Sequence, residues 1–354
     1  MMIPQLCRQM LCALLGLPCL SLAAETADLV YRFPTENTAL LSGKNDDFFM
    51  YCDRDFEGTK SRPWQAGSYG MVRTPLRLHN GEVLCTRMHE GIDIKPLRRD
   101  AQGEPLDEIH PIAPGRVVYT CTNPGMSNYG RYVVVEHTVP EGQIYSLYAH
   151  LSQVTCTPGQ VVGTGNKLGI MGHTGSGINR ARSHVHLEVG IMIHSQYEQF
   201  SPKENKHGNF NGLNLVGIDP SPLLIACQNG APLSLTKHWA TLTEHYRVRV
   251  PYGNEVPDFL RRYPFLYRGA WQPAPKSLDV AFTAEGVPVA VYPSQQEVST
   301  PTVIKCTPMP TLQQNVTVKR VQNSSKNAQL STSGMNYVMQ FFHPIITTPR
   351  NPES

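Results

Sequence analysis

The sequence has little charge, and the charge that it has is spread along the chain. Charged residues make up 17% of the 354 residues, the formal net charge is +3, and no run of like charge occurs. Proteins that bind nucleic acid through their surface charge carry clustered lysines and arginines. We therefore expect no nucleic-acid partner.

Long apolar runs are missing after the first two dozen residues. The N-terminal segment contains Arg8, then a mostly apolar run over residues 10–20 and then Ser21-Leu22-Ala23-Ala24, an order typical of a secretory signal peptide. This run is shorter than the roughly 20 residues that span a bilayer. We expect cleavage after Ala23 or Ala24, no membrane span afterwards, and export to the periplasm, the cell envelope or the extracellular space.

Pairs of cysteines with the C-x-x-C spacing of a metal site or a redox centre are also missing. Three of the nine cysteines lie in the predicted signal peptide, which leaves six. The alternative for Cys19 is a lipid anchor, which the preceding Gly16-Leu17-Pro18 fits poorly. Because an even number of cysteines in an exported chain favours disulfides, we expect two or three bridges. The six cysteines are Cys52, Cys85, Cys121, Cys156, Cys227 and Cys306.

No long segment has the 3.6-residue periodicity of an amphipathic helix. Short segments rich in β-branched and aromatic residues alternate instead with glycine turns, so residues 76–225 should form an antiparallel β fold. Farther along, residues 255–262 are expected to form a short helix, and residues 278–282 and 287–292 a hairpin. The strands expected in the first region are 115–120, 132–137, 144–150, 158–163, 167–172 and 184–193.

Composition divides the chain into five parts, and the fold class that it predicts is mainly β. The N-terminal segment is polar and turn-rich and should wrap the main domain, whereas the region after it should form a smaller accessory β-rich domain. The last residues, rich in proline, asparagine and serine, should be disordered. The expected boundaries are 1–24 for the signal peptide, 25–75 for the N-terminal segment, 76–225 for the main domain, 226–345 for the accessory domain and 346–354 for the tail.

The segment 183–189, Ser-His-Val-His-Leu-Glu-Val, alternates polar and apolar residues. As a strand it directs His184, His186 and Glu188 to one face. Imidazole is the commonest protein ligand for zinc, although an exposed polar face would show the same pattern. Farther upstream, His89 and Asp93 stand four residues apart. Three protein ligands that leave one position open are the arrangement of a catalytic zinc.

Five segments of the middle of the chain occur in a characteristic order. The segments are His89-x-x-x-Asp93, Tyr148-Ala-His-Leu-Ser152, Pro158-Gly-Gln-Val-Val-Gly163, Gly172-x-Thr174-Gly175 and His184-Val-His-Leu-Glu188. Together they resemble the motifs of the lysostaphin/LytM-type zinc metallopeptidases. The resemblance implies an antiparallel β peptidase domain with a Zn²⁺ cofactor. It also implies hydrolysis of peptide bonds in peptidoglycan stem peptides or cross-bridges, and so a role in remodelling or lysis of the cell wall.

The resemblance also implies a role for each polar residue of these motifs. His89, Asp93 and His186 would bind the zinc, and His150 and His184 would act on the bound water and on the scissile carbonyl. Zinc brings the pKa of a bound water to about 7 and polarises a carbonyl. A nearby imidazole can accept a proton or stabilise an oxyanion, and the sequence leaves open which of the two histidines does which.

Two other interpretations remain at this point. The first is a LytM-like module without catalytic activity, which binds the wall or activates an amidase. Members of that kind usually lack zinc ligands, whereas this chain has all three. The second is a structural or adhesive surface protein in which residues 226–354 bind the wall.

The chain departs from the family pattern in the loop before the His-x-His strand, where it has two arginines. Because a guanidinium can bind a carboxylate through two parallel hydrogen bonds, Arg180 and Arg182 are candidates for binding a substrate carboxylate. A solvated loop is the alternative. His173 is a candidate to line the same groove. Glu188 either orients a zinc ligand or is exposed on the strand, and His137 is expected to have a hydrogen-bonded packing role.

Overall fold

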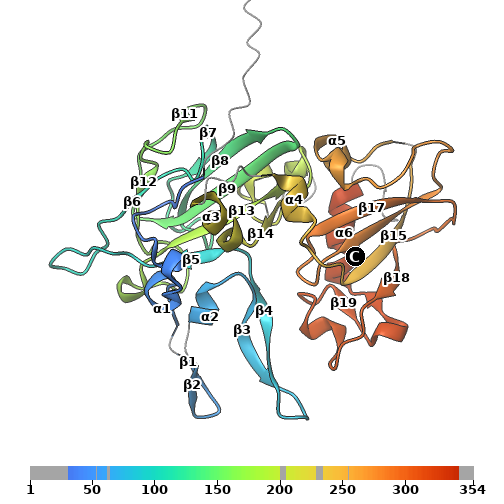
Figure 1. The fold of residues 1–354 in the computed structure, drawn as a ribbon, viewed down its shortest axis with the longest axis horizontal. Helices are drawn as coiled ribbons and strands as arrows, with labels where there is room; N and C mark the ends of the chain where they lie inside the picture. Colours follow the sequence, from blue (N-terminus) through green and yellow to red (C-terminus); the bar gives the residue numbers. More distant parts are fainter. Residues whose placement is uncertain are drawn as a thin grey trace, which may run out of the picture.

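A computed structural model describes residues 31–52, 54–61, 64–199, 205–228, 234–253 and 255–342 of the chain (Figure 1). The predicted signal peptide and the predicted disordered tail lie outside the described residues. Antiparallel strands dominate the described part, as the alternating pattern predicts. In the same ranges, we find no helix that combines the length and the apolar character needed to cross a bilayer.

The largest sheet has seven strands in the order β11-β7-β8-β9-β13-β14, with β5 paired to the start of β13. Its members are β5 (Ile92–Ile94), β7 (Gly115–Cys121), β8 (Arg131–Val139), β9 (Gly142–Leu151), β11 (Val161–Val162), β13 (Val185–Met192) and β14 (Leu215–Ile218). Five of the six predicted strands lie in this sheet. The sixth contributes β12 to a small sheet formed by β6 (Glu108–Ile109), β10 (Gln153–Val154) and β12 (Gly169–Ile170).

Both faces of the seven-stranded sheet are covered, and successive residues of a strand belong to different cores. Val133 and Val135 of β8 belong to the larger core, whereas Tyr132 and Val134 belong to a smaller core on the opposite face. In β13, Val185, Leu187, Val189 and Ile191 point into the larger core. The intervening residues of β13, which include two of the predicted site residues, therefore lie on the face of the smaller core.

The part of the chain before this sheet packs against β5 and then forms a long hairpin. It contains η1 (Ala39–Ser42), α1 (Asn45–Phe48), β1 (Arg54–Phe56), β2 (Thr59–Ser61) and α2 (Trp64–Gly67). The amide of Met50 donates to the carbonyl of Asp93 at 2.8 Å, and Phe49 bridges Ile94. The hairpin of β3 (Gly70–Arg77) and β4 (Val83–His89) projects from the sheet and ends at the first predicted zinc ligand (Figure 1).

The C-terminal part contains a second antiparallel sheet, in the order β17-β16-β15-β18. Its strands are β15 (Tyr246–Pro251), β16 (Ser277–Phe282), β17 (Pro288–Ser294) and β18 (Thr302–Cys306). The predicted hairpin is confirmed as β16–β17, and the predicted short helix as α5 (Asp258–Arg262). The pattern did not predict the helix α6 (Thr332–Phe342), whose Phe341 packs edge-on against Phe282.

Short elements complete the described part of the chain. The helices are α3 (Pro220–Gln228) and α4 (Leu235–Trp239), and β19 (Val321–Gln322) pairs with β20 (Gln329–Leu330). The single turns of 3-10 helix are η2 (Arg180–Arg182), η3 (Tyr197–Gln199), η4 (Gly208–Phe210), η5 (Pro264–Leu266), η6 (Gln313–Asn315) and η7 (Ser325–Asn327).

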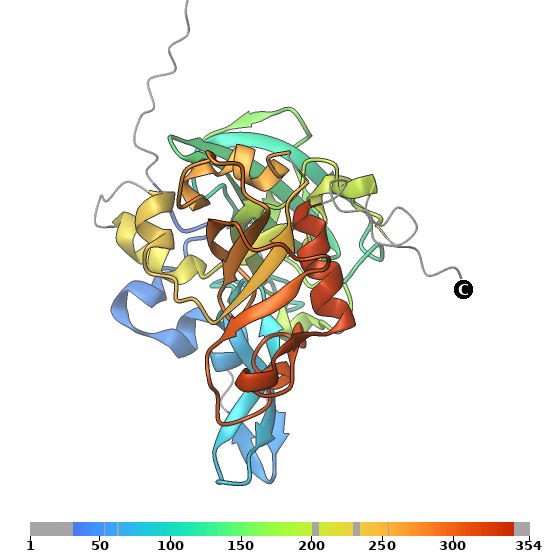
Figure 2. The same cartoon turned by 90° about the vertical axis from the view of Figure 1, so that its right-hand side faces the viewer.

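Among the described residues, contacts between the C-terminal part and the rest include one near α5 and one at the β3–β4 hairpin; in Figure 2 the C-terminal part faces the viewer. Near α5, the hydroxyl of Tyr263 donates to the carbonyl of Gln143 at 2.9 Å and accepts from the amide of Met192 at 3.1 Å. The second contact is with the tip of the β3–β4 hairpin, around a cavity of about 350 Å³. Side chains that line this cavity include Leu78 and Val83 of the hairpin and Met309, Pro310 and Val316 of the C-terminal part. The hairpin therefore connects the C-terminal part with the region of His89.

The structure differs from the prediction of disulfides. Cys52, Cys85, Cys121, Cys156 and Cys306 are free thiols, and the side chain of Cys227 lies outside the described residues. Cys156 belongs to the larger core and Cys121 to the smaller core, so each is packed among apolar neighbours on its own face of the sheet. The two or three expected bridges are therefore absent among the cysteines that the structure describes. An even count carries no information about which thiols lie close enough to pair.

His137 has the packing role that its position on an apolar strand predicts. Its side chain is fully buried, Nδ1 donates to the carbonyl of Pro114 at 2.9 Å, and Nε2 lies 2.7 Å from Oγ of Ser146. Burial lowers the pKa of His137 to about 4, although the hydrogen bond to Pro114 opposes this shift. The folded protein therefore keeps this imidazole neutral at pH values where the unfolded chain, with a histidine pKa of roughly 6.5, takes up a proton.

We expect the stability to fall by up to about 3 kcal/mol through His137 as the pH drops from about 6.5 to about 4, because only the unfolded state binds the extra proton. His137→Asn can keep the hydrogen bond to Pro114 but does not titrate. The urea midpoint of the variant should therefore change less between pH 7 and pH 4 than that of the wild type. His110→Asn, on a partly exposed histidine, serves as the control and should follow the wild type. If the urea midpoints of His137→Asn and of the wild type changed equally between pH 7 and pH 4, this explanation would be wrong.

Candidate metal centre and active site

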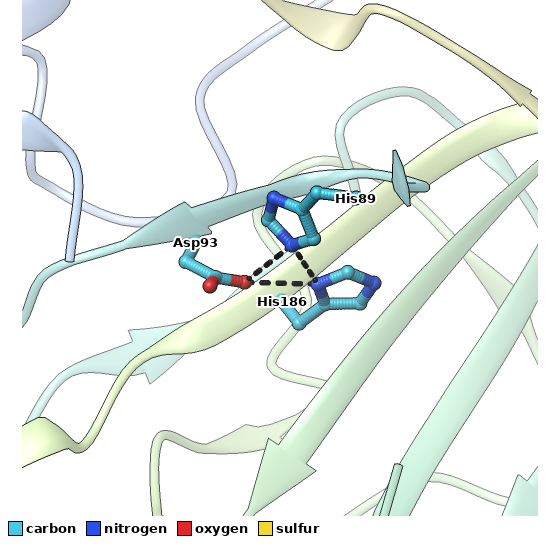
Figure 3. A group of neighbouring side chains, drawn as sticks. All are labelled: His89, Asp93 and His186. Atoms are coloured by element: carbon cyan, nitrogen blue, oxygen red, sulfur yellow. Dashed lines mark hydrogen bonds and ion pairs between the residues drawn. The ribbon is translucent and has the colours of Figure 1, made fainter. Parts of the chain in front are cut away.

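Three of the predicted residues come together at one point of the sheet (Figure 3). His89 ends β4, Asp93 lies in the middle of β5, and His186 is its direct partner in the antiparallel pairing of β5 with β13. Nε2 of His89 lies 3.0 Å from Oδ1 of Asp93 and 3.0 Å from Nδ1 of His186, and the latter two atoms are 2.9 Å apart. All three side chains are buried.

These three atoms fit a zinc site. Tetrahedral zinc with bonds of about 2.0–2.1 Å has ligand atoms about 3.3 Å apart, so only a small outward shift would admit the ion. The outer nitrogens of the imidazoles are already bound: Nδ1 of His89 donates to the carbonyl of Ser68 at 2.7 Å, and Nε2 of His186 lies 2.9 Å from Oε1 of Glu188. Each ring therefore directs its remaining nitrogen to the same point as Oδ1 of Asp93.

Glu188 orients one of these rings. The residue is 2% exposed, and its Oε1 also accepts a hydrogen bond of 2.6 Å from the hydroxyl of Tyr129. The alternative of an exposed strand glutamate is therefore wrong. Tyr129 was not identified from the sequence, because it lies in the loop before β8 and nothing in its local pattern distinguishes it.

His150 and His184 lie beside the three clustered residues. Their rings are 4.8 Å apart between centroids, and the ring of His150 is 5.7 Å from that of His186. Nδ1 of His150 donates to the carbonyl of Thr174 at 2.9 Å, and Nδ1 of His184 donates to the carbonyl of Arg182 at 2.7 Å. Because each Nδ1 carries the proton, each neutral ring keeps Nε2 as a proton acceptor.

The backbone at His150 departs from a regular strand. Its φ is +66°. Between the pairs Arg131–Leu151 and Val133–Tyr148, β9 advances by three residues while β8 advances by two, so β9 contains a β-bulge here. A left-handed conformation at a residue other than glycine costs of order 1–3 kcal/mol and often marks a functional site. The bulge directs His150 toward His184 and His186.

The electrostatics of the site favour neutral imidazoles at two positions. Burial lowers the pKa of His89, and burial together with the nearby His184 and His186 holds the pKa of His150 well below its usual value. Burial alone would raise the pKa of Asp93, but the histidines around it keep it well below its usual range. For His186, burial lowers the pKa, but hydrogen bonds to the carboxylates of Asp93 and Glu188 outweigh this and raise it to about 10. A metal ion would therefore replace a proton at His186.

An arginine that the sequence did not single out also reaches the site. Nη2 of Arg73 lies 2.7 Å from Oδ2 of Asp93, the oxygen that points away from the two histidines. Arg73 is on β3, twenty residues before Asp93 in the sequence and outside the motifs that identified the other residues. Only the folding of the β3–β4 hairpin onto β5 brings the two side chains together.

The predicted substrate-binding residues lie in the loop before β13, and their side chains have partners within the protein. Nε of Arg180 is 2.7 Å from Oε1 of Glu104, and Nε2 of His173 is 3.0 Å from Oε2 of the same carboxylate. Nη2 of Arg182 is 2.6 Å from Sγ of Cys52. The loop is thus held by specific contacts, although more than half of the Arg180 side chain is exposed.

Comparison with known families gives a match over the middle of the chain. Residues 87–199 match the model of Peptidase family M23. This range contains His89, Asp93, His150, His184 and His186, and it ends before the C-terminal sheet begins. None of the curated proteins matches the chain.

Solved structures of peptidases are similar to parts of this chain over short alignments. A peptidase M23 from Pseudomonas aeruginosa is 28% identical, with 28% of this chain and 37% of that chain covered and a TM-score of 0.23. A zinc-containing peptidase from Vibrio cholerae is 22% identical, with coverages of 34% and 36% and a TM-score of 0.23. The catalytic domain of lysostaphin from Staphylococcus simulans is 23% identical, with coverages of 44% and 88% and a TM-score of 0.27.

The chain thus spans little more than a third of the length of the first two of these relatives. Because all three TM-scores are below 0.5, the assignment depends on the family match and on the site residues that it contains.

Proposed function

We propose, on the basis of the match of residues 87–199 to Peptidase family M23, that the protein is an exported zinc metalloendopeptidase that hydrolyses peptide bonds in peptidoglycan. The observation that carries the proposal is the convergence of His89, Asp93 and His186, with their ligand atoms within 4.8 Å of one another. Two further histidines, whose Nδ1 atoms donate to backbone carbonyls, stand beside this group. Candidate metal ligands and candidate proton acceptors thus lie in one buried site.

In this proposal His89, Asp93 and His186 bind the zinc. A bound zinc ion would supply a Lewis acid and lower the pKa of a water molecule to about 7. Nε2 of His150 or of His184 accepts the proton of the attacking water, and the protonated ring can then donate to the leaving amine. Nε2 of His184 lies 3.4 Å from Oδ1 of Asp93, so this ring faces the proposed metal ligands.

The loop with the two arginines would determine part of the substrate preference. Arg180 remains the candidate for a carboxylate of a peptidoglycan stem peptide, and such a carboxylate would have to replace Glu104 as its partner. Arg182 is directed toward Cys52, and His173 toward Glu104, so these two residues would shape the loop rather than contact the substrate.

The alternative is an M23-like module without catalytic activity, which binds the cell wall or activates an amidase. The presence of the complete ligand group argues for the enzyme, because a binding module has no need of three converging buried ligands. The two functions predict different results for the same purified protein.

We expect the purified protein to contain about one equivalent of zinc and to lower the turbidity of purified peptidoglycan. Elemental analysis measures the first property, and the absorbance of a sacculus suspension measures the second. A chelator should abolish the hydrolysis, and added zinc should restore it, because the hydroxide for attack depends on the ion. A protein that binds sacculi but contains no zinc and releases no fragments would support the non-catalytic module instead.

A further inference from the structure

We propose that Arg73 is a positioning residue for the metal-binding carboxylate. It binds Oδ2 of Asp93 and so leaves Oδ1 as the only oxygen of this carboxylate that can bind the metal ion. The inference rests on the proposed function, since it concerns the ligands of the proposed zinc site. It adds a residue that lies before the part of the chain that matches the family.

The two oxygens of Asp93 have separate sets of partners. Oδ1 lies 3.0 Å from Nε2 of His89 and 2.9 Å from Nδ1 of His186, whereas Oδ2 lies 2.7 Å from Nη2 of Arg73. The guanidinium is itself held in place, because its Nε donates to the carbonyl of Ala66 at 2.9 Å. Asp93 is only 4% exposed, so water cannot readily replace this partner.

The backbone around Arg73 is irregular on both sides. Met71 pairs with Met88 and Arg73 pairs with Arg87, so Val72 is an extra residue and forms a β-bulge. On the other side, Thr74 has a φ of +58°, a conformation that β-branched residues rarely adopt. Bulges redirect side chains near active sites, and such strained residues persist where the surrounding structure fixes them. Both irregularities flank the one residue of β3 that reaches Asp93.

A carboxylate can bind a metal through one oxygen or through both. If Asp93 used both, it would fill a coordination position that a catalytic site keeps for water or substrate. Arg73 opposes this because it already binds Oδ2, and a guanidinium stays protonated at all relevant pH values and cannot itself bind a cation. The contact therefore fixes both the orientation of Asp93 and the number of oxygens that it offers.

The test uses cobalt(II) as a spectroscopic substitute for zinc, in the wild type and in Arg73→Gln. Four-coordinate cobalt absorbs strongly in the visible range, and absorption weakens as the coordination number rises. We expect intense bands for the wild type and several-fold weaker bands for Arg73→Gln, in which Asp93 is free to bind through both oxygens. Chelator competition should also show zinc binding weakened by roughly 10–100-fold, the usual cost of losing a partner that orients a ligand.

Arg87→Gln is the matched control. It removes the same charge from the cross-strand partner of Arg73 in the same hairpin, and among the described residues it is Arg73, not Arg87, that pairs with Asp93. Its spectrum and zinc affinity should equal those of the wild type. Arg73→Lys keeps the charge but cannot bind Ala66 and Asp93 together, so its spectrum should lie between those of the wild type and Arg73→Gln.

A measurement on the wild type alone covers the case in which the Arg73 variants do not fold. The infrared difference spectrum between the zinc-loaded and the metal-free protein should show the widely separated carboxylate bands of binding through one oxygen. Closely spaced bands, or identical cobalt spectra and zinc affinities for the wild type and Arg73→Gln, would overturn the role of Arg73 while leaving the proposed function intact. A wild type that binds neither metal would refute both the proposed function and this inference.

Discussion

His186→Ala is expected to lose both the metal and the activity. The substitution removes one of the three proposed zinc ligands, and Nδ1 of His186 lies within 3.0 Å of both other proposed ligand atoms. We expect zinc affinity to fall by more than the roughly 100-fold that loss of an outer hydrogen-bond partner can cost. Hydrolysis should fall by about 10³-fold or more, because the ion supplies several kcal/mol of transition-state stabilisation. Elemental analysis after dialysis and a peptide-release assay measure the two losses.

His186→Gln separates loss of the ligand from loss of the fold. A glutamine amide can occupy the position of Nε2 and keep the contact with Glu188, but it offers no nitrogen at the position of Nδ1. This variant should therefore stay folded, bind zinc as poorly as His186→Ala, and lose the rise in melting temperature that zinc gives the wild type. A folded His186→Gln protein that retained one equivalent of zinc would show that His186 is not a ligand.

The candidate site was predictable from the sequence where local spacing determines geometry. Alternation along a strand places His186 and Glu188 on one face, and the structure has both side chains on the face of the smaller core. A separation of four residues suffices for His89 and Asp93 to meet, because β4 ends at His89 and β5 starts three residues later. These residues, whose relative positions follow from local spacing, are also residues that carry the family resemblance.

The contacts of Arg73 could not be predicted in this way. They depend on a bulge at Val72 and on a left-handed Thr74, and neither feature has a sequence pattern of its own. The pairing of Arg180 with Glu104 is equally hidden, because it joins two loops that are far apart in the sequence. In each case the tertiary structure, not the local sequence, determines the partner of a charged side chain.

The helix α6 was missed for a different reason. It begins with threonine, serine and glycine, which are poor helix formers. A Cβ on Gly334 would lie 1.9 Å from the carbonyl oxygen of Arg320, so the glycine is required by close packing against another segment. The buried residues Tyr337, Val338, Phe341 and Phe342 recur at helical spacing. The helical spacing of apolar residues was therefore present in the sequence, but the segment is too short for this periodicity alone to predict a helix.

His150→Asn is expected to keep the metal and lose most of the turnover. Asparagine tolerates the left-handed backbone at this position, where φ is +66°, and its amide can replace Nδ1 as the donor to the carbonyl of Thr174. The substitution removes Nε2, the atom that we propose as a proton acceptor. We expect kcat to fall by roughly 10²–10⁴-fold, the range of general acid–base assistance, with zinc content unchanged. The same result is expected for His184→Asn, whose amide can still donate to the carbonyl of Arg182.

His110→Asn is the control for both substitutions, because His110 is a partly exposed histidine whose Nδ1 contacts the carbonyl of Asn166, outside the site. It should retain full activity. If His150→Asn lost zinc together with activity, His150 would have to be a ligand and not a proton acceptor. If both His150→Asn and His184→Asn hydrolysed peptidoglycan at the rate of the wild type, neither imidazole would take part in proton transfer. Proton transfer would then have to occur through water alone at the three proposed ligands. The β-bulge and the left-handed backbone at His150 would have no role in catalysis.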